Sequence, residues 1–430
     1  YPDYKNARVE WFDNYPSSWS VRKIKHIFHI TKKISGELGH DILSITQQGV
    51  KKKDIESGSG QLSMDYSKYQ LVDQGDFLMN HMDLLTGYVD ISEFDGVTSP
   101  DYRVFKLVMK DSDPNYFLYL FQNGYRSKIF YGYGRGSSHL GRWRFPSVEF
   151  ENFYLPVPPH YEQTLISKYL DRKTSQIDVL IEKIERKIEL LKEHRTSLIN
   201  QCVTKGLEPT VEMKDSGIEW IGEIPSHWEV KKFGFVSRLE TGNTPSKTQE
   251  DLYFTDDEKG FPWVKPSDLD IGLKGVNNTE SKLTVEGKDQ SRVIPKNSIL
   301  VCCIGNTSGK YSISNRELST NQQINSITFN ENVVPRYGLY FMDVFGRDLL
   351  KWMNFVTLPI ISKGDLSQEK LIVPPMSEQK EIVSRLDEYI FTQGRMIEGE
   401  IKRIKLLKEY RQSLISSVVT GKVRVVEDMV

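Results

Sequence analysis

The sequence VPPHYEQ at residues 157–163 returns 216 positions later as VPPMSEQ at residues 373–379. A second pair precedes these copies. EWFDNYPSSWSVRK at residues 10–23 matches EWIGEIPSHWEVKK at residues 219–232, here 209 positions apart. An internal repeat of this length indicates two copies of one supersecondary plan. We therefore expect the fold to contain a pseudo-twofold internal repeat.

Each copy of the VPP motif opens a long segment with helical periodicity. Pro158 and Pro159 favour an extended backbone and keep the helix from starting earlier. Gly206 and Pro209 end it. Between these limits the apolar residues recur at spacings of three, four and seven, which is typical of an amphipathic helix with a narrow apolar seam. The seam residues are Ile166, Leu170, Ile177, Ile181, Ile184, Ile188, Leu191, Leu198 and Cys202.

The second copy repeats this helix from residue 378 to about residue 420. LKEHRTSLI at residues 191–199 falls on LKEYRQSLI at residues 407–415 in the same register. A helix of roughly 40 residues is about 60 Å long, and in isolation its seam would be exposed to water. The second seam consists of Ile382, Leu386, Ile390, Ile397, Ile404, Leu407, Leu414 and Val418.

The two helices are natural partners for each other. Helix one leaves the first globule and delivers the chain to the second, and by the repeat helix two must return it in the same way. Only an antiparallel pair satisfies both conditions. We therefore expect an α+β protein in which two mixed α/β globules are separated by two long antiparallel helices that form a coiled coil. The C-terminus should then lie near the N-terminal globule.

Composition sets broad limits on the class of protein. The chain has 430 residues and a formal net charge of −1. No run of about 18 apolar residues exists, so we expect no membrane span. Cys202, Cys302 and Cys303 form neither a disulfide framework nor a zinc site. We expect a reduced, cytoplasmic setting, and no metal site.

Catalytic signatures are incomplete throughout the sequence. Pro100-Asp101 could open a nuclease motif, but the next Glu-x-Lys begins only at Glu185, within the first long helix. GNTSGK at residues 305–310 resembles part of a phosphate loop, yet the residue after Lys310 is Tyr311 rather than Ser or Thr. With no complete motif, we expect the chain to catalyse nothing by itself.

Basic and aromatic residues concentrate in two stretches of the first globule. Residues 22–53 carry far more basic than acidic residues and include Lys51 and Lys52. Residues 114–148 contain no Asp or Glu, and their glycines would allow close backbone approach to a ligand. This composition favours nucleic-acid binding. A core strand followed by a solvated basic loop would have a similar composition, so this interpretation also stays open. The candidate contacts in the second stretch are Arg135, Ser137, Ser138, His139, Arg142 and Arg144.

Three consecutive amides form a further candidate in the second globule. Asn321, Gln322 and Gln323 could read adenine through paired hydrogen bonds. Amides of this kind are also common in turns, so both interpretations stay open.

The motifs together resemble the specificity (S) subunits of type I restriction-modification enzymes. The resemblance covers essentially the whole chain. It rests on the two VPPxxEQ helix starts, the two LKExRxSLI helix ends and several further motifs. These are KDSGIEWIGEIPSHWEV (214–230), FLMNHMDLLTGYVDISEFDGVTSPDY (77–102), TGNTPSK (241–247), WVKPSDL (263–269), IGNTSGK (304–310) and TNQQ (320–323).

The resemblance implies a division of labour along the chain. Residues 1–155 and 207–372 would be target-recognition domains, each reading one half of an asymmetric bipartite DNA site. Residues 156–206 and 373–430 would be the spacer helices, the latter with the C-terminal tail, and would dock two modification (M) subunits. The M subunits would use S-adenosylmethionine to methylate adenine, and restriction (R) subunits would use ATP and Mg²⁺. This chain would bind no cofactor and no small-molecule substrate itself.

We also predict further DNA contacts, most of them within the motifs of the resemblance. Those within the motifs are Asn80, His81 and Tyr102 in the first globule and Thr244, Lys247, Lys265, Asn306, Thr307, Ser308 and Lys310 in the second. Arg103 and Lys363, which lie outside these motifs, complete the set. Two alternative functions stay open at this point: a specificity chain of a type IIB-like restriction system, and a scaffold whose globules bind protein.

Overall fold

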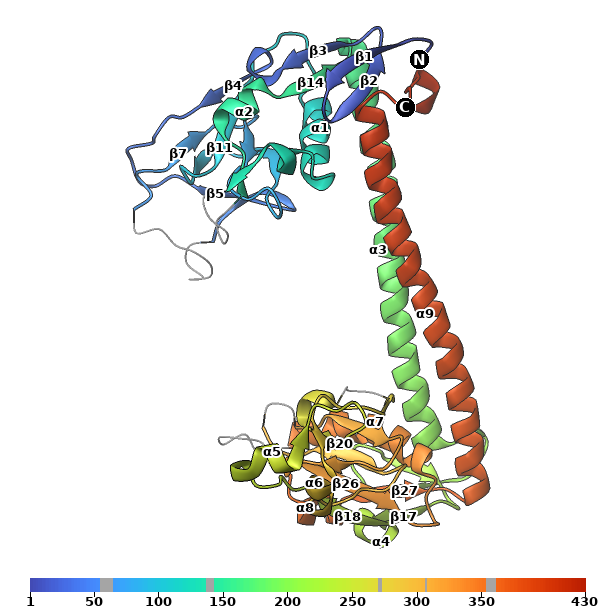
Figure 1. Cartoon of the computed structure of the whole chain (residues 1–430). Coiled ribbons are helices and arrows are strands. Elements are labelled where there is room, and N and C mark those ends of the chain that lie inside the picture. Colours follow the sequence, from blue (N-terminus) through green and yellow to red (C-terminus); the bar gives the residue numbers. More distant parts are fainter. Residues whose placement is uncertain (55–64, 137–142, 270–272, 306–307, 353–360) are drawn as a thin grey trace. The chain divides into compact units, whose positions relative to one another are not determined.

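The chain folds into two compact units of mixed α and β structure (Figure 1). Unit 1 comprises Tyr1–Glu185 and Ile401–Val430, and unit 2 comprises Arg186–Glu400. The end of the chain therefore belongs to the unit that contains its beginning, as the repeat predicts. The computed structural model describes residues 1–54, 65–136, 143–269, 273–305, 308–352 and 361–430.

Two long helices, α3 (His160–Lys205) and α9 (Met376–Val419), each contribute to both units. Most of the predicted seam is buried. On α3 the buried seam residues are Ile166, Leu170, Ile177, Ile181, Ile184, Ile188 and Cys202, and on α9 they are Ile382, Leu386, Leu414 and Val418. Among the described residues, no helix has both the length and the apolar character needed to cross a membrane.

Contacts between the helices occur within each unit. In unit 1, Asp178 of α3 forms an ion pair with Arg411 of α9 at 3.0 Å. In unit 2, Lys187 Nζ lies 2.6 Å from Glu400 Oε1. The Gln393 amide of α9 also donates to the Leu191 carbonyl oxygen at 2.5 Å.

Unit 1 is built on two four-stranded sheets with the orders β4-β11-β8-β9 and β6-β5-β10-β7. The first is antiparallel throughout, whereas β5 and β10 of the second run parallel. The strands are β4 (Phe28–Thr31), β5 (Ile42–Thr46), β6 (Gly49–Lys52), β7 (Gln70–Val72), β8 (Phe77–Met79), β9 (Val89–Ile91), β10 (Gly96–Thr98) and β11 (Arg103–Leu107).

Smaller elements complete unit 1. They are the antiparallel pairs β1 (Tyr4–Val9) with β2 (Phe12–Pro16), β3 (Ser20–Lys23) with β14 (Tyr154–Val157), and β12 (Arg135–Gly136) with β13 (Trp143–Arg144), the helices α1 (Pro114–Arg126) and α2 (Ser147–Asn152), and the 3-10 turns η1 (Ile24–His26), η2 (Phe130–Tyr133) and η5 (Glu427–Met429).

The core between α1 and the first sheet is aromatic. Phe28 contacts Phe77 and Phe117 edge to face, with ring centroids 5.1 and 5.3 Å apart.

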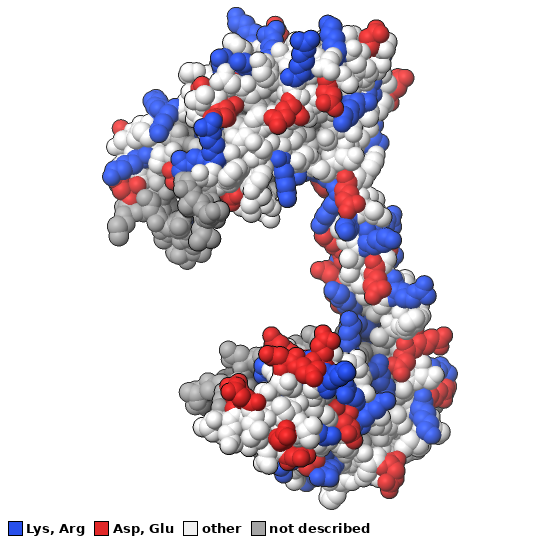
Figure 2. All heavy atoms as spheres, viewed as in Figure 1, with Lys and Arg blue, Asp and Glu red and all other residues white. Residues whose placement is uncertain are grey.

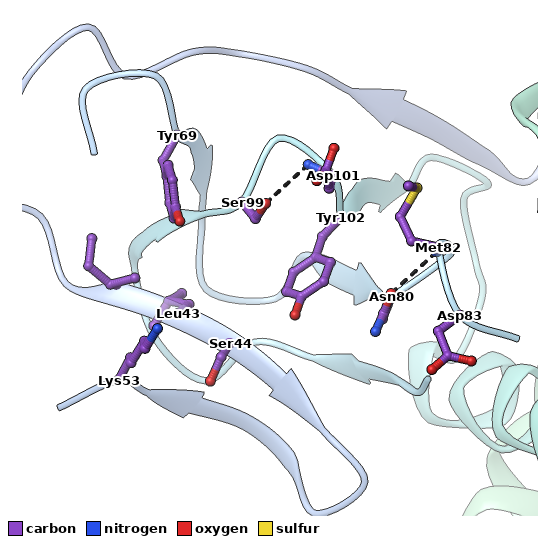
Figure 3. Close-up of a pocket in the computed structure, with 11 residues that line it drawn as sticks. Leu43, Ser44, Lys53, Tyr69, Asn80, Met82, Asp83, Ser99, Asp101 and Tyr102 are labelled. Atoms are coloured by element: carbon purple, nitrogen blue, oxygen red, sulfur yellow. Dashed lines mark hydrogen bonds between the residues drawn. The ribbon is translucent and has the colours of Figure 1, made fainter. Parts of the chain in front are cut away.

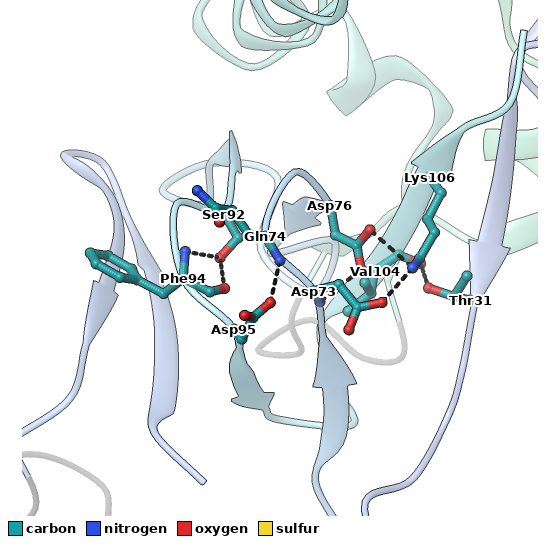
Figure 4. Close-up of polar contacts among 9 residues, drawn as sticks. All are labelled: Thr31, Asp73, Gln74, Asp76, Ser92, Phe94, Asp95, Val104 and Lys106. Carbon is teal, nitrogen blue, oxygen red and sulfur yellow. Dashed lines mark hydrogen bonds and ion pairs between the residues drawn. The ribbon is translucent and has the colours of Figure 1, made fainter. Parts of the chain in front are cut away.

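Charged contacts fasten one end of the first sheet in unit 1 (Figure 4). Lys106 near the end of β11 places its Nζ 2.6 Å from Asp73 and 3.5 Å from Asp76, which lie in the turn before β8. Burial raises the pKa of the Asp76 carboxyl, and the nearby ammonium opposes this effect. The backbone N–H of Gln74 donates to Asp95 Oδ1 at 2.7 Å and joins the same turn to the segment before β10.

Unit 2 is built on sheets with the orders β18-β26-β23-β24-β21 and β19-β22-β20-β25. In the first sheet β21 and β24 are parallel, and in the second β20 and β25 are parallel. The strands are β18 (Ser237–Thr241), β19 (Phe254–Thr255), β20 (Phe261–Val264), β21 (Gly275–Val276), β22 (Lys282–Leu283), β23 (Ile299–Cys302), β24 (Tyr311–Ser314), β25 (Ser319–Thr320) and β26 (Ile324–Phe329).

Smaller elements also complete unit 2, where two strand pairs correspond to β1–β2 and β3–β14 of unit 1. They are the antiparallel pairs β15 (Met213–Asp215) with β16 (Glu223–Pro225) and β17 (Glu229–Lys232) with β27 (Lys370–Val373), the helices α4 (Phe233–Val236), α5 (Glu250–Tyr253), α6 (Val285–Asp289), α7 (Pro335–Trp352) and α8 (Lys363–Gln368), and the 3-10 turns η3 (Lys247–Gln249) and η4 (Pro266–Asp268).

The repeated sequence motifs form the same hydrogen bonds in both units. The buried indole of Trp19 donates to Glu162 at 2.8 Å, and that of Trp228 donates to Glu378 at 2.9 Å. The glutamate of each VPPxxEQ motif therefore accepts from the tryptophan of the other repeated motif, which explains why the two motifs recur together.

The glutamine of each motif is buried, and its side chain both donates and accepts hydrogen bonds. Gln379 donates to the carbonyl oxygens of Asn332 and Pro374 and accepts from the Val334 amide, at 2.8 to 2.9 Å. Gln163 donates to Pro158 O and accepts from the Asp113 amide, each at 2.9 Å. Both glutamines join the start of a long helix to the helix that packs against the sheet.

A buried tyrosine in each unit joins the two long helices to the globule. The Tyr116 hydroxyl on α1 lies 2.9 Å from Pro156 O and 3.1 Å from Val419 O. The Tyr337 hydroxyl on α7 lies 3.1 Å from Ile372 O and 3.3 Å from Val203 O. Each hydroxyl thus contacts the strand that precedes one long helix and the last turn of the other.

Replacing Gln379 with alanine should destabilise unit 2. The substitution leaves the Val334 amide and two carbonyl oxygens without their partner, and each unsatisfied buried group costs about 1–3 kcal/mol. Chemical denaturation should show this loss in Gln379→Ala. Gln201→Ala at an exposed position of α3 is the matched control and should change little. Equal stability of the two variants would contradict this account.

Two glycine-to-alanine substitutions should have opposite effects. Gly421 follows α9 with φ +74°, and a Cβ there would lie 2.5 Å from Pro16 Cδ, so Gly421→Ala should destabilise the fold by at least about 1 kcal/mol. Gly399 lies inside α9 with no atom near an added Cβ, so Gly399→Ala should stabilise it by about 0.5–1 kcal/mol. Thermal unfolding of both variants measures these signs, and the same sign for both would refute the assignment.

Candidate nucleic-acid interface

Three loops of unit 1 meet at one end of its first sheet. Antiparallel pairing places Arg103, the first residue of β11, opposite Met79, the last residue of β8. It also places Val104 opposite Thr31, the last residue of β4. The segments that follow β4, follow β8 and precede β11 therefore lie together. They hold the predicted residues Asn80, His81 and Tyr102.

Unit 2 repeats this arrangement. Ile324, the first residue of β26, pairs with Cys302 at the end of β23, and Asn325 pairs with Thr241 at the end of β18. The corresponding segments hold the predicted residues Thr244, Ser308, Asn321, Gln322 and Gln323. Candidates that are scattered along the sequence are thus gathered at the equivalent sheet end of each unit.

A polar cavity of about 340 Å³ opens beside the loops of unit 1 (Figure 3). It contains two of the predicted residues, Asn80 and Tyr102. The other lining residues were not among the predicted DNA contacts, although Asp101 directly precedes the predicted Tyr102 in the sequence and could have been found from that neighbour. The lining residues are Ile42, Leu43, Ser44, Lys53, Tyr69, Asn80, Met82, Asp83, Ser99, Asp101 and Tyr102.

Buried hydrogen bonds hold the loops around this cavity in place. The side chain of Gln70, which is 2% exposed, donates to Ser99 O at 2.8 Å and to Tyr102 O at 2.7 Å. The Tyr125 hydroxyl donates to Asn80 O at 2.7 Å. These contacts fix the backbone of both loops before any ligand binds.

The predicted contact His81 is uncharged near neutral pH. Burial lowers the pKa of its imidazole to about 3, and the positive charges of Arg103 and Arg144 act in the same direction. Its carbonyl oxygen accepts from the Phe145 amide at 2.8 Å. His81 therefore offers a hydrogen-bonding ring without a positive charge near neutral pH.

Arg103 is a structural residue, and its prediction as a DNA contact is wrong. It is 3% exposed, its guanidinium donates to Phe145 O at 2.8 Å, and it lies 4.3 Å from the centre of the Phe150 ring. Burial lowers the pKa of this side chain to about 10. The alternation of β11 turns Arg103 into the unit, where it fastens the segment before α2.

Exposed basic residues lie on two strand pairs of unit 1. Lys51 and Lys52 are on β6, and Lys52 forms an ion pair with Asp41 at 2.5 Å. Arg135 and Arg144 face each other across β12 and β13, with Arg135 2.5 Å from Glu149. The predicted residues Ser137, Ser138, His139, Arg142, Asn306 and Thr307 lie outside the described part of the chain.

The amides of unit 2 form a turn. Asn321 is 7% exposed, its amide nitrogen donates to Gln323 Oε1 at 2.9 Å, and its oxygen accepts from the Gln323 backbone at 3.1 Å. The turn interpretation therefore describes Asn321, whose side chain is engaged locally. Gln322 is exposed and accepts a hydrogen bond from the Thr244 hydroxyl.

The remaining candidates of unit 2 surround these loops. Lys265 follows β20. The carbonyl oxygen of Val264, the last residue of that strand, accepts from the backbone N–H of Asn321 at 3.0 Å. Lys363 begins α8, and the backbone N–H of Ile361, two residues earlier, donates to Cys303 O at 2.9 Å. Lys310 is half-buried and Ser308 is buried, 6% exposed. Lys247 begins η3, and its side chain lies outside the described part.

Charges on the long helices are mixed rather than concentrated. Figure 2 shows basic and acidic side chains interspersed along them. Pairs such as Arg385 with Glu381, 2.8 Å apart, are typical of solvated helix faces.

Comparisons with known proteins agree with this arrangement. Residues 16–190 and 225–406 match the family described as type I restriction modification DNA specificity domain. The type I restriction enzyme MjaIX specificity subunit of Methanocaldococcus jannaschii is 25% identical over 435 residues, covering 96% of this chain and 95% of that protein.

Two solved structures share the fold. A chain from work on complex assembly and conformational transition of the type I R-M system has a TM-score of 0.68 at 14% identity, with 95% of this chain and 99% of that chain covered. The HsdS subunit from Thermoanaerobacter tengcongensis has a TM-score of 0.57 at 14% identity, with 96% and 100% covered. These matches do not favour the scaffold or the type IIB-like alternative. The chain belongs to the type I restriction modification DNA specificity family and is a DNA specificity subunit of such a system.

Proposed function

We propose that each unit reads one half of an asymmetric bipartite site in double-stranded DNA through the loops at its sheet end. The observation that carries the proposal is the equivalent placement of these loops in the two units. The residues they present differ, since Tyr102 lies before β11 in unit 1 where Gln322 lies before β26 in unit 2. Different side chains at equivalent places should select different half-sites.

The helices α3 and α9 would form an antiparallel coiled coil that sets the spacer between the half-sites. The ion pairs Asp178–Arg411 and Lys187–Glu400 support this pairing. Exposed apolar side chains on α9, including Phe391 at 67% and Leu406 at 54% exposure, would help to dock two M subunits.

The chain would supply recognition and leave the chemistry to its partners. The M subunits would bind S-adenosylmethionine, and the R subunits would bind ATP and Mg²⁺. The chain would bind none of these cofactors and would act in the cytoplasm.

The complex of this chain with its M partner should methylate adenine at a bipartite motif. Genome-wide mapping of N6-methyladenine in a host that carries both chains should return two unlike half-sites with one fixed spacer. Fluorescence titration with DNA of that motif should show binding that weakens with salt, because phosphate contacts release counterions. Binding that ignores DNA sequence would contradict the proposal and support a scaffold.

Lengthening both helices by one heptad should lengthen the spacer. Duplicating residues 179–185 and 401–407 keeps both apolar seams in phase and extends the pair by about 10 Å. The methylation motif should then gain about 3 base pairs between unchanged half-sites. Duplication in α3 alone is the control and should impair function by breaking the pairing. An active double insertion with the original spacer would exclude the helices as the ruler.

A further inference from the structure

The cavity of unit 1 combines opposite kinds of hydrogen-bonding group. Asp101 is exposed, and its carboxylate has no hydrogen-bond or ion-pair partner among the described residues. The Asn80 side-chain oxygen accepts from the Met82 amide at 3.2 Å, which leaves its Nδ2 group as a donor. Asp101, on the loop before β11, thus has a free acceptor, and Asn80, on the loop after β8, has a free donor. Both residues line the cavity, and Figure 3 shows the two loops that carry them.

The other acid that lines the cavity, Asp83, has a local role. Asp83 accepts from the backbone amides of Leu85 at 2.9 Å and Thr86 at 3.0 Å. It therefore caps the turn that carries the loop after β8. Asp101 is the acid that remains for a ligand.

The walls of the cavity are held rigidly. The buried Thr98 hydroxyl donates to Leu43 O at 2.9 Å, and β10 pairs in parallel with β5 through the same residues. Asp101 follows β10 closely, so its position relative to the Leu43 wall is set by the sheet. A preorganised site loses little conformational entropy when it binds.

Charge and ring composition select the kind of ligand. Among the described residues, the lining holds one cation, Lys53, and two anions, Asp83 and Asp101, and this balance disfavours a phosphate. Tyr69 and Tyr102 provide aromatic faces suited to a planar, uncharged ring. A carboxylate accepts hydrogen bonds only, which matches the amino group that cytosine and adenine present in the major groove.

We propose that this cavity reads a DNA base with an exocyclic amino group, cytosine or adenine, and that Asp101 and Asn80 determine specificity there. The inference rests on the proposed function and deepens it. The exposed Lys51 and Lys52 on β6, which pairs with the cavity strand β5, contact phosphates and position the duplex.

The test compares methylation motifs of Asp101→Asn, Asn80→Ala and the wild-type chain, each with its M partner. Both variants relax one base position, a cytosine or an adenine, in one half-site only. Discrimination there falls by roughly 5- to 150-fold, which corresponds to about 1–3 kcal/mol. The other half-site and the spacer are unchanged and report that the protein is folded and assembled.

Asp111→Asn is the matched control, because Asp111 is exposed in unit 1 and does not line the cavity. It keeps the wild-type motif. The inference is overturned if both cavity variants keep the wild-type base discrimination in both half-sites. It is also overturned if discrimination falls in both half-sites. A wild-type chain that yields no bipartite motif instead refutes the proposed function, so the two failures are distinguishable.

Discussion

The structure depends on one buried tyrosine hydroxyl in each unit. Tyr116 and Tyr337 are fully buried, and each brings the last turn of one long helix to the strand that leads into the other. Burial raises the pKa of both hydroxyls well above the usual range, so they stay protonated. A buried hydroxyl needs partners, and these carbonyl oxygens supply them. The start of one helix and the end of the other are thereby fixed to the same globule.

Around these anchors each unit can vary its recognition surface. The hydrogen bonds from tryptophan to glutamate and those of the buried glutamines hold together the parts of the fold that the two units share. The loops at the sheet end carry different residues in the two units. Buried side chains such as Gln70 hold the backbone of these loops in place through hydrogen bonds. A protein that recognises two unlike half-sites needs the same anchoring contacts in both units and different loops in each.

Local patterns predicted the helices well, because the apolar seams and the flanking Pro and Gly residues are near in sequence. The first long helix begins at His160, directly after the two prolines that were expected to precede it, and the second begins at Met376, close to the predicted residue 378. The cavity could not be predicted in this way. Tyr69 and Asp101 meet only through the long-range pairing of β7 and β10, and Arg103 looked like a DNA contact until β11 turned it inward.

Hydrogen–deuterium exchange of the chain assembled with its M partner, with and without its bipartite DNA, tests the central claim most directly. The account predicts that DNA slows exchange at residues 80–83 and 99–102 of unit 1 and at residues 321–323 of unit 2. The turns between β1 and β2 and between β15 and β16 should be unaffected. Protection confined to those turns, with the loops unchanged, would contradict the account.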